Sequence, residues 1–305
     1  QTSDNSDLYQ ADNQTRKQPL PKDAPSKSSK IPTLQPQLIQ NDSDLEALAK
    51  KLMSYKETLE PVALDTETTS LNPFKAELVG IGVCWGEAPN ELAYIPIGHQ
   101  QQGSLIEEKG HKNQLSLEKV LTDLEPWLSS DSHPKVLQNA KYDRLIFLRH
   151  GLPLRGVTMD TLLADYLRDA NAKHGLDEMS KREFSYTPQV FDQLVRKGET
   201  FANVDIKTAS LYCGMDVHLT RRLSFRLGDK LKEIGSELID LLEKVEQPLE
   251  PVLASMETTG ICIDIPYLKE LSYELTKAIK ELEKKAHIAA EISFNLASPK
   301  QLGEV

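Results

Sequence analysis

Four carboxylic acids and one phenol are the residues of this chain whose types and spacing could do chemistry. Three short segments carry them: DTETTSL with Asp65 and Glu67, NAKYD with Asp143, and YCGMD with Tyr212 and Asp216. Carboxylate oxygens are hard ligands, which suit Mg²⁺ or Mn²⁺ rather than zinc or copper. Two such ions about 3.5–4 Å apart can activate a water and stabilise the leaving oxygen of one in-line displacement. The set therefore indicates cleavage of a phosphodiester by a two-metal site.

The first acidic pair follows a short apolar segment that is typical of a buried strand. Val62–Leu64 is apolar, and a buried strand that ends in acids places them at the sheet edge where α/β folds hold their sites. Asp65 and Glu67 are two residues apart, so they point to the same side of an extended segment. Acids after a strand are usually turn or cap residues when they stand alone. The three motifs in order favour the catalytic interpretation instead.

The third motif has the spacing of a helix. Tyr212 and Asp216 are four residues apart in a segment with helical apolar spacing, which puts the phenol and the carboxylate on one face. Cys213 is adjacent to Tyr212, and we expect it to point elsewhere and to serve in packing. Asp143 lies in a stretch, Tyr142–His150, that can also be helical.

The remaining pattern predicts an α/β fold. We expect a helix in NDSDLEALAKKL, with Ser43 and Glu46 in capping-box spacing. Turn residues separate three apolar, β-branched segments that should form a meander. The predicted strands are Val62–Asp65, Leu78–Trp85, Leu92–Ile97 and Val136–Gln138, and Ser116–Leu128 is a predicted helix. From Asp143 onward we predict mostly helix, so a mixed sheet is followed by helices.

The motifs and the sequence around them resemble one known family. The resemblance covers VALDTETTSLNPFKAELVGIGVCWG, AYIPIGH, VLQNAKYDRLIFLRHGLPLRGVTMDTLLADYLRDANAKHGLDEMS and the YCGMD helix. Residues 38–305 resemble the 3′–5′ exonuclease domain, and the region after it, of family-A DNA polymerases of the bacterial DNA polymerase I type. The resemblance implies an RNase H-like exonuclease fold, a mixed sheet with flanking helices, followed by a helical partial thumb.

The resemblance also implies a role for each acid and for the phenol. Asp65 would bridge both metal ions, and Glu67 and Asp216 would complete the shell of the first. Asp143 would hold the second ion, largely through water. Tyr212 would orient the attacking water and share its proton. All five positions match the family pattern.

Five further residues match family positions that touch the nucleic acid. Thr68 and Leu71 resemble residues at the terminal nucleotide, with Leu71 as an apolar wedge against its base. Gln138, Asn139 and Tyr142 lie where the family contacts the single strand. The ring of Tyr142 also has a physical reason to be there, since an aromatic ring stacks on any base.

Both ends of the chain differ from its centre. Residues 1–37 are rich in Gln, Ser, Asp, Lys and Pro, a composition that cannot offset the entropy of ordering, so we expect a disordered linker. At the other end, a break at Gly260 precedes a predicted helix with one apolar face, formed by Leu268, Leu271, Leu275, Ile279 and Leu282. This region resembles the start of the polymerase domain and its thumb. We therefore expect a linker at 1–37, an exonuclease domain at 38–230 and a truncated polymerase domain at 231–305, without the palm and fingers of the parent.

Composition limits the partners and the location. The net charge is −10, whereas nucleic-acid binders usually have a basic surface. A site that concentrates carboxylates explains part of this charge, because bound metal ions then face the phosphates. The three cysteines form no CxxC pair, which argues against zinc or a disulfide framework and fits a reducing cytosol. No run of eighteen apolar residues occurs, so we expect no membrane span and a cytoplasmic, monomeric protein, associated with the nucleoid in a bacterium.

These observations together predict a proofreading 3′–5′ exodeoxyribonuclease with two divalent ions, Mg²⁺ or Mn²⁺. Its expected substrate is the single-stranded 3′ end of a primer-template, from which it releases nucleoside 5′-monophosphates. One alternative is an RNA exonuclease of the ribonuclease D type, which shares the same five residues. The other is a catalytically silent scaffold that braces a polymerase. The thumb-like C-terminus argues against the first alternative, and the presence of all four acids argues against the second.

Overall fold

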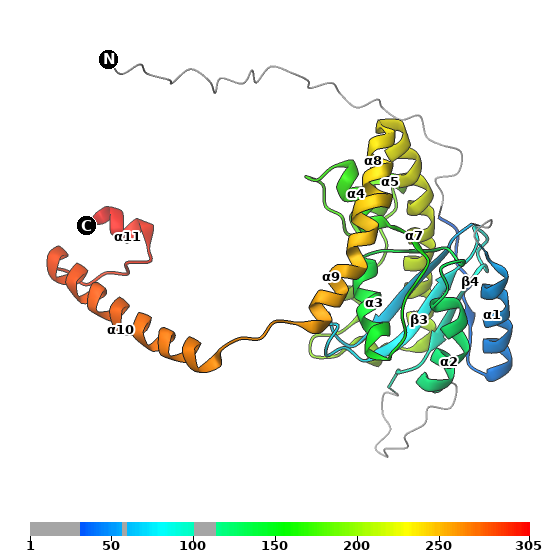
Figure 1. The fold of residues 1–305 in the computed structure, drawn as a ribbon, viewed down its shortest axis with the longest axis horizontal. Coiled ribbons are helices and arrows are strands. Elements are labelled where there is room, and N and C mark those ends of the chain that lie inside the picture. The colour runs from blue at the N-terminus through cyan, green and yellow to red at the C-terminus, as the bar shows by residue number, and fades with distance from the viewer. Residues whose placement is uncertain (1–30, 57–59, 101–113) are drawn as a thin grey trace. The chain divides into compact units, whose positions relative to one another are not determined.

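A computed structural model describes residues 31–56, 60–100 and 114–305, and the chain divides into two compact units (Figure 1). The first unit ends at Ala254, and the second runs from Ser255 to Val305. This division rests on contacts alone. The functional boundary at residue 230, which the resemblance suggests, stays a prediction.

A mixed sheet forms the centre of the first unit. Its strand order is β1-β4-β3-β2-β5-β6. β2, β3 and β4 pair antiparallel, which confirms the predicted meander, whereas β1, β5 and β6 join the sheet in parallel. The strands are β1 (Gln37–Leu38), β2 (Val62–Thr68), β3 (Leu78–Cys84), β4 (Leu92–Pro96), β5 (Lys135–Leu137) and β6 (Val157–Asp160).

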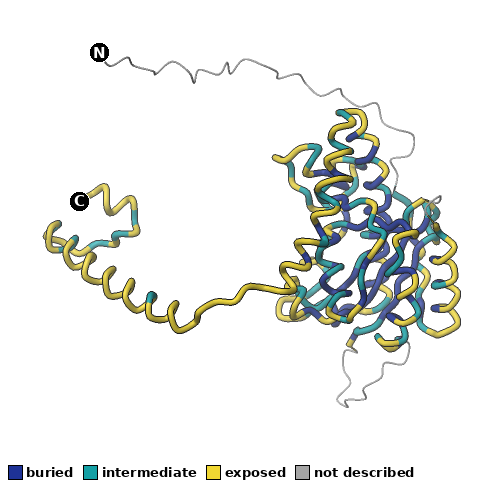
Figure 2. The backbone as a smooth tube through the Cα atoms, viewed as in Figure 1, coloured by how far each residue is buried: buried dark blue, intermediate teal, exposed yellow. Residues whose placement is uncertain are grey.

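Helices cover both faces of the sheet. α1 (Asp42–Ser54), α2 (Leu117–Leu128) and α3 (Ala140–Arg149) pack with Val62, Leu64 and Ile81 in the largest apolar core. The other face carries the long helix α7 (Ile206–Ile234), which contacts β2, β3, β4 and β5. Figure 2 shows the strands between these layers as the most deeply buried part of the unit. The remaining elements of this unit are α4 (Thr161–Arg168), α5 (Leu176–Phe184), α6 (Phe191–Leu194), η1 (Phe201–Asn203), α8 (Ser236–Leu241), the π-helical turn η2 (Leu242–Glu246) and the first part of α9 (Gln247–Thr259).

Three local predictions differ from the structure. α1 is capped by Asn41, whose side chain accepts a hydrogen bond from the backbone N–H of Asp44 at 3.0 Å, so the expected capping box at Ser43 and Glu46 is wrong. β6 lies in a region predicted as helix, because a strand of four residues gives no recognisable period. The expected linker falls mainly on residues 1–30, outside the described part, but Leu34 is buried and packs against the sheet.

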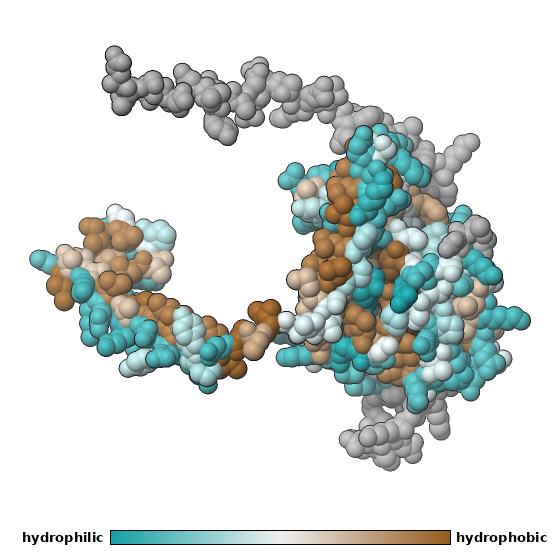
Figure 3. All heavy atoms as spheres, in the orientation of Figure 1, coloured by the Kyte–Doolittle hydropathy of each residue, from teal (hydrophilic) through white to brown (hydrophobic). Residues whose placement is uncertain are grey.

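The second unit is helical. Gly260 breaks the helical path with φ +69°, a conformation that favours glycine, and α10 (Ile265–Ala290) and α11 (Pro299–Glu304) follow. Hydrophobic side chains along α10 remain exposed, among them Leu268, Leu275 and Ile279 (Figure 3). They belong to the apolar face that the sequence predicts. Among the described helices of the whole chain, none combines the length and the hydropathy needed to cross a membrane.

Candidate functional site

β2 presents the first two acids toward α7. Side chains alternate along a strand, so Asp65 and Glu67 share a face with Ala63, which packs in one cluster with Val217 of α7. Asp65 lies opposite Gly82 of β3 in the sheet register. The register shifts between Glu67 and Thr68, which ends the regular pairing directly after the acids.

A glycine in β3 lets α7 approach these acids closely. A Cβ atom on Gly82 would lie 2.4 Å from Sγ of Cys213, a distance that real Cβ atoms do not show. The close approach brings Cys213 to the acids, because its sulfur and oxygens of Asp65 and Glu67 all lie within 4.8 Å of one another. The expectation that Cys213 points away from the site is therefore wrong. Although Cys213 is adjacent to Tyr212 in sequence, α7 packs so closely on β3 that the Cys213 side chain faces the sheet.

Asp143 reaches the site from the opposite face of the sheet, on the first turn of α3. Its side chain is buried, with Oδ1 accepting two hydrogen bonds from Thr66: one from the backbone N–H at 3.0 Å and one from the hydroxyl at 2.6 Å. Thr66 lies between Asp65 and Glu67 in β2. These bonds therefore fix α3 to the strand that carries the first two acids.

A further buried carboxylate, that of Asp160, caps the N-terminus of α3. Its oxygens accept hydrogen bonds from the backbone N–H groups of Asn139 at 2.9 Å, Ala140 at 2.8 Å and Leu162 at 2.9 Å. Asn139 has left-handed backbone geometry with φ 63°, which turns the chain sharply from β5 into the helix. Asp160 was not among the residues predicted from the sequence. The only local signal is its position before the apolar-periodic α4, which it also caps.

Burial raises the pKa of all four acids, and the charge of Asp65 raises it further in the other three. Burial raises the pKa of Asp65 to about 7. Burial, and then the charge of Asp65, raise the pKa of Asp143 and of Asp216 well above their usual range. Burial raises the pKa of Glu67 in the same way, with further contributions from the charges of Asp65 and Asp216. Such mutual repulsion is what a cluster of carboxylates shows before a cation binds.

Eight of the ten predicted site residues line one cleft of about 390 Å³. They are Asp65, Glu67, Thr68, Leu71, Gln138, Asn139, Tyr142 and Asp143. The side chain of Leu71 stands at the cleft almost free of contacts, since 96% of the residue is exposed. The hydroxyl of Tyr142 is held by the Thr68 hydroxyl and the carbonyl of Ser70.

The side-chain amide of Gln138 forms hydrogen bonds within the protein through both its nitrogen and its oxygen. Its Nε2 donates to the carbonyl of His174 at 2.9 Å, and its Oε1 accepts from the hydroxyl of Thr161. Gln138 therefore links the end of β5 to the loop before α5, in addition to lining the cleft.

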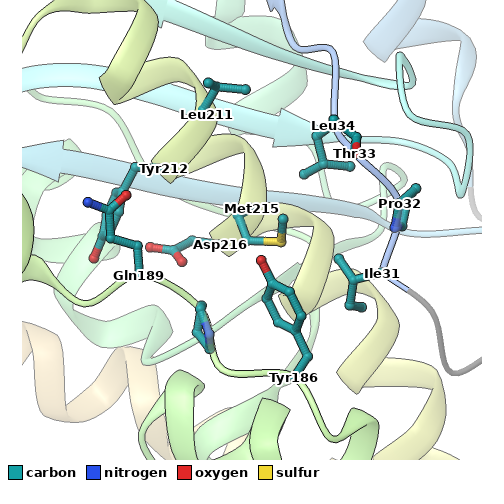
Figure 4. A pocket seen from close by; sticks show the side chains of 11 residues that line it. Ile31, Pro32, Thr33, Leu34, Tyr186, Gln189, Leu211, Tyr212, Met215 and Asp216 are labelled. Atoms are coloured by element: carbon teal, nitrogen blue, oxygen red, sulfur yellow. The ribbon is translucent and has the colours of Figure 1, made fainter.

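Tyr212 and Asp216 line a second cleft, of about 370 Å³, on the α7 side (Figure 4). A hydrogen bond joins the two side chains and stabilises the ionised form of Asp216. Burial raises the pKa of Tyr212, and the charges of Asp216, Glu67 and Asp65 raise it further, so the phenol keeps its proton. The charges of Asp65 and Glu67 in β2 thus act on Tyr212, so the two clefts adjoin the same group of acids.

Several residues that line the two clefts were not predicted from the sequence. Tyr186 and the segment Ile31–Leu34 line the second cleft, and Figure 4 shows them across from the α7 side chains. Phe191, Glu199 and Thr200 line the first. Phe191 is stacked on Phe201, with ring centroids 6.4 Å apart. Aromatic residues in polar loop sequence were the available signal, but nothing local tells which cleft they line.

The residues present fit hard divalent cations. Oε1 of Glu67 is buried and has no hydrogen-bond partner within the described part of the chain, which is unusual for a carboxylate oxygen. Oxygen donors from Asp65, Glu67, Asp143 and Asp216 are the set that Mg²⁺ or Mn²⁺ prefers. A cation would relieve both the orphaned oxygen and the mutual repulsion.

Comparison with known proteins gives the class of this chain. A family model described as 3′–5′ exonuclease matches residues 36–232. The chain belongs to this 3′–5′ exonuclease family. The predicted membership in the exonuclease family of the DNA polymerase I type is thereby confirmed.

The relatives are polymerases much longer than this chain. DNA polymerase I of Synechocystis sp. is 41% identical over 278 residues, which cover 89% of this chain and 27% of that protein. DNA polymerase I of Rhizobium leguminosarum is 37% identical over 256 residues, 80% of this chain and 25% of that protein. The chain thus spans about a quarter of the length of these relatives.

Solved structures confirm the fold class. The polymerase domain of Pol1 from M. smegmatis, in complex with DNA primer-template and dNTP, has a TM-score of 0.67 at 22% identity, covering 87% of this chain and 39% of that chain. RNase D of Escherichia coli, an exoribonuclease, has a TM-score of 0.54 at 16% identity, covering 73% of this chain and 51% of that chain. The mixed sheet with flanking helices is therefore the RNase H-like exonuclease fold, as predicted.

Proposed function

We propose that this chain hydrolyses the 3′-terminal phosphodiester of DNA and releases nucleoside 5′-monophosphates, as the proofreading part of a DNA polymerase I. Membership in the 3′–5′ exonuclease family supports the reaction. The names of the relatives, which are DNA polymerases, support DNA as the substrate. In this proposal residues 38–230 form the exonuclease domain and residues 231–305 begin the polymerase domain.

One observation supports the proposed site above the others: acids from three distant segments share a buried centre in which Oε1 of Glu67 has no hydrogen-bond partner among the described residues. Asp65, Glu67, Asp143 and Asp216 would hold two divalent ions there. Bound ions would supply activation of a water and stabilisation of the leaving 3′ oxygen. The protein contributes the positions of the four acids, which β2, α3 and α7 fix from different sides.

Tyr212 would orient the attacking water. Its raised pKa keeps the phenol neutral, and because its single O–H is directed to Asp216, its oxygen would orient the water by accepting a hydrogen bond from it. Asp216 restricts the direction of the ring by accepting a hydrogen bond from the same hydroxyl. Tyr212 would therefore assist the reaction, while most of the charge of the transition state would be stabilised by the two bound ions.

The first cleft would hold the terminal nucleotide. The exposed Leu71 and the rings of Tyr142 and Phe191 supply apolar surfaces at its wall, while Thr68 and Asn139 supply polar groups. Rings stack on every base, so such a cleft favours single strands without reading their sequence. This suits an enzyme that removes any mispaired end.

The test is a nuclease assay on single-stranded DNA, 3′-mismatched DNA and RNA of equal sequence, with Mg²⁺ and with EDTA. We expect stepwise loss of nucleotides from the 3′ end of DNA, which EDTA and Asp65→Ala both abolish. Asp131→Ala serves as the control, since that acid is exposed and is not among the residues that line the two clefts. Preference for RNA would support the ribonuclease D type instead. Absence of both cleavage and calorimetric Mg²⁺ binding would support the silent scaffold.

A further inference from the structure

We propose that Glu250 and Gln247, in the first turns of α9, are positioning residues for the candidate metal site. Both lie beyond the residues 36–232 that the exonuclease family model matches. Both are within the first compact unit and contact segments that carry or hold Asp143. The inference rests on the proposed function, because it assumes that Asp143 takes part in metal binding.

Glu250 forms a two-pronged ion pair with Arg144, the residue after Asp143 in α3. Nε of Arg144 donates to Oε1 at 2.7 Å, and Nη2 donates to Oε2 at 2.7 Å. The two side chains are only 11% and 7% exposed. A paired fork of this kind fixes direction as well as distance, and a buried one is weakly screened by water.

The same guanidinium holds a third segment. Nη1 of Arg144 donates to the carbonyl of Leu154, in the loop that leads from α3 to β6. Arg144 therefore joins α9, α3 and this loop through one rigid group. Loss of Glu250 would leave the buried Arg144 cation, among the described residues, with the Leu154 carbonyl alone, so α3 would have to shift or admit water.

Gln247 supports the N-terminus of the same helix indirectly, through Asp160. Its Oε1 accepts from the backbone N–H of Asp160 at 2.7 Å, and its Nε2 donates to the carbonyl of Val157 at 3.3 Å. Asp160 is the residue whose carboxylate begins α3 by binding the N–H groups of Asn139 and Ala140. Gln247 thus fixes the strand end from which α3 is capped.

α3 is consequently held from two sides. Thr66 of β2 fixes the Asp143 carboxylate directly, while α9 fixes the helix backbone through Arg144 and Asp160. The proposed site needs Asp143 at a set distance from Asp65 and Glu67, and a shift of α3 would change that distance. Groups that orient a metal-binding side chain in this way typically change metal affinity or activity by about 10–100-fold when removed.

The test compares Glu250→Gln with Asp240→Asn in the complete chain. Asp240 pairs with Lys244 at 2.9 Å in the helical region just before α9, and both side chains of this pair are exposed. Three quantities are measured: Mn²⁺ affinity by calorimetry without DNA, the Mg²⁺ concentration for half-maximal cleavage of single-stranded DNA, and hydrogen exchange of the α3 amides. For Glu250→Gln we expect metal affinity about tenfold weaker, a higher Mg²⁺ midpoint and faster α3 exchange. Asp240→Asn should match the wild type.

Each other outcome decides the inference. A Glu250→Gln protein that loses thermal stability but keeps metal affinity and α3 exchange at the control level would show a merely structural role. If Glu250→Gln does not fold, Gln247→Ala decides, since that side chain carries no charge: a smaller rise of the Mg²⁺ midpoint supports the inference, and an unchanged midpoint overturns it. Full activity of Asp65→Ala would instead refute the proposed function. An inactive Asp65→Ala beside a normal Glu250→Gln refutes the inference alone.

Discussion

The acidic centre should destabilise the metal-free protein, and Asp65→Asn should therefore make that protein more stable. Burial raises the pKa of Asp65 from 3.8 to about 7. Between these values the folded chain keeps a proton that the unfolded chain releases, so the free energy of unfolding falls as the pH rises through this window. Above pH 7 the loss is complete. Asparagine has the same shape and does not ionise.

The size of the effect follows from the pKa. A rise from 3.8 to about 7 corresponds to about 4 kcal/mol against the ionised carboxylate. Asp65 is partly exposed, so solvent screening reduces this value, and we expect about 1–2 kcal/mol. For a domain of this size the variant should melt about 2–8 °C higher than the wild type at pH 8.

Thermal unfolding in EDTA at pH 8 and pH 4.5 measures this difference, with Asp131→Asn as an exposed control. The gap between Asp65→Asn and the wild type should shrink toward pH 4.5, where both folded proteins are largely uncharged at this position. Added Mg²⁺ should reverse the order, because ligand binding stabilises only the chain that binds it. If the Asp65→Asn protein is no more stable than the wild type at pH 8 in EDTA, the inference that the ionised Asp65 carboxylate destabilises the metal-free protein is refuted.

Three further variants test other parts of the site. Tyr212→Phe should slow cleavage about tenfold, equal to about 1.4 kcal/mol, and not abolish it, as measured by single-turnover rates. Gly82→Ala should lose about 1–3 kcal/mol in urea unfolding because its Cβ would meet Cys213, whereas Gly303→Ala, in open space, should not. Asp160→Asn should lose about 1–3 kcal/mol and weaken Mn²⁺ binding in calorimetry, since the neutral amide offers one oxygen to three N–H groups; unchanged affinity would contradict its role in holding α3.

The sequence predicted the elements whose signals are local. Val62–Asp65 and Leu78–Trp85 are visible as strands because apolar, β-branched runs end at turn residues. The motif that carries Tyr212 and Asp216 is visible as a helix because its apolar residues repeat with a helical period. The same local signals failed at the start of α1, where Asn41 and Ser43 are both good caps and only the backbone path selects Asn41.

What the sequence did not reveal depends on contacts between distant segments. Cys213 faces Glu67 because Gly82 lets α7 approach the sheet, and no spacing rule contains that distance. The pairing of Glu250 with Arg144 joins residues 106 positions apart. A glutamate on a helix is usually a surface residue, so only its burial in the fold identifies this one as a partner.

Four acids can be held together in this site because the elements that carry them are attached separately. Repulsion among Asp65, Glu67, Asp143 and Asp216 pushes β2, α3 and α7 apart, so each element needs an independent attachment. β2 lies between two hydrogen-bonded neighbours, α7 packs its apolar face on the sheet, and α3 is fixed by Thr66, Asp160 and Arg144. α3 has 10 residues against the 29 of α7, and unlike β2 it has no hydrogen-bonded strand neighbours to hold it in place. Polar attachments at both of its sides are therefore a physical requirement of the site, and the first turns of α9 supply the side that the sheet does not.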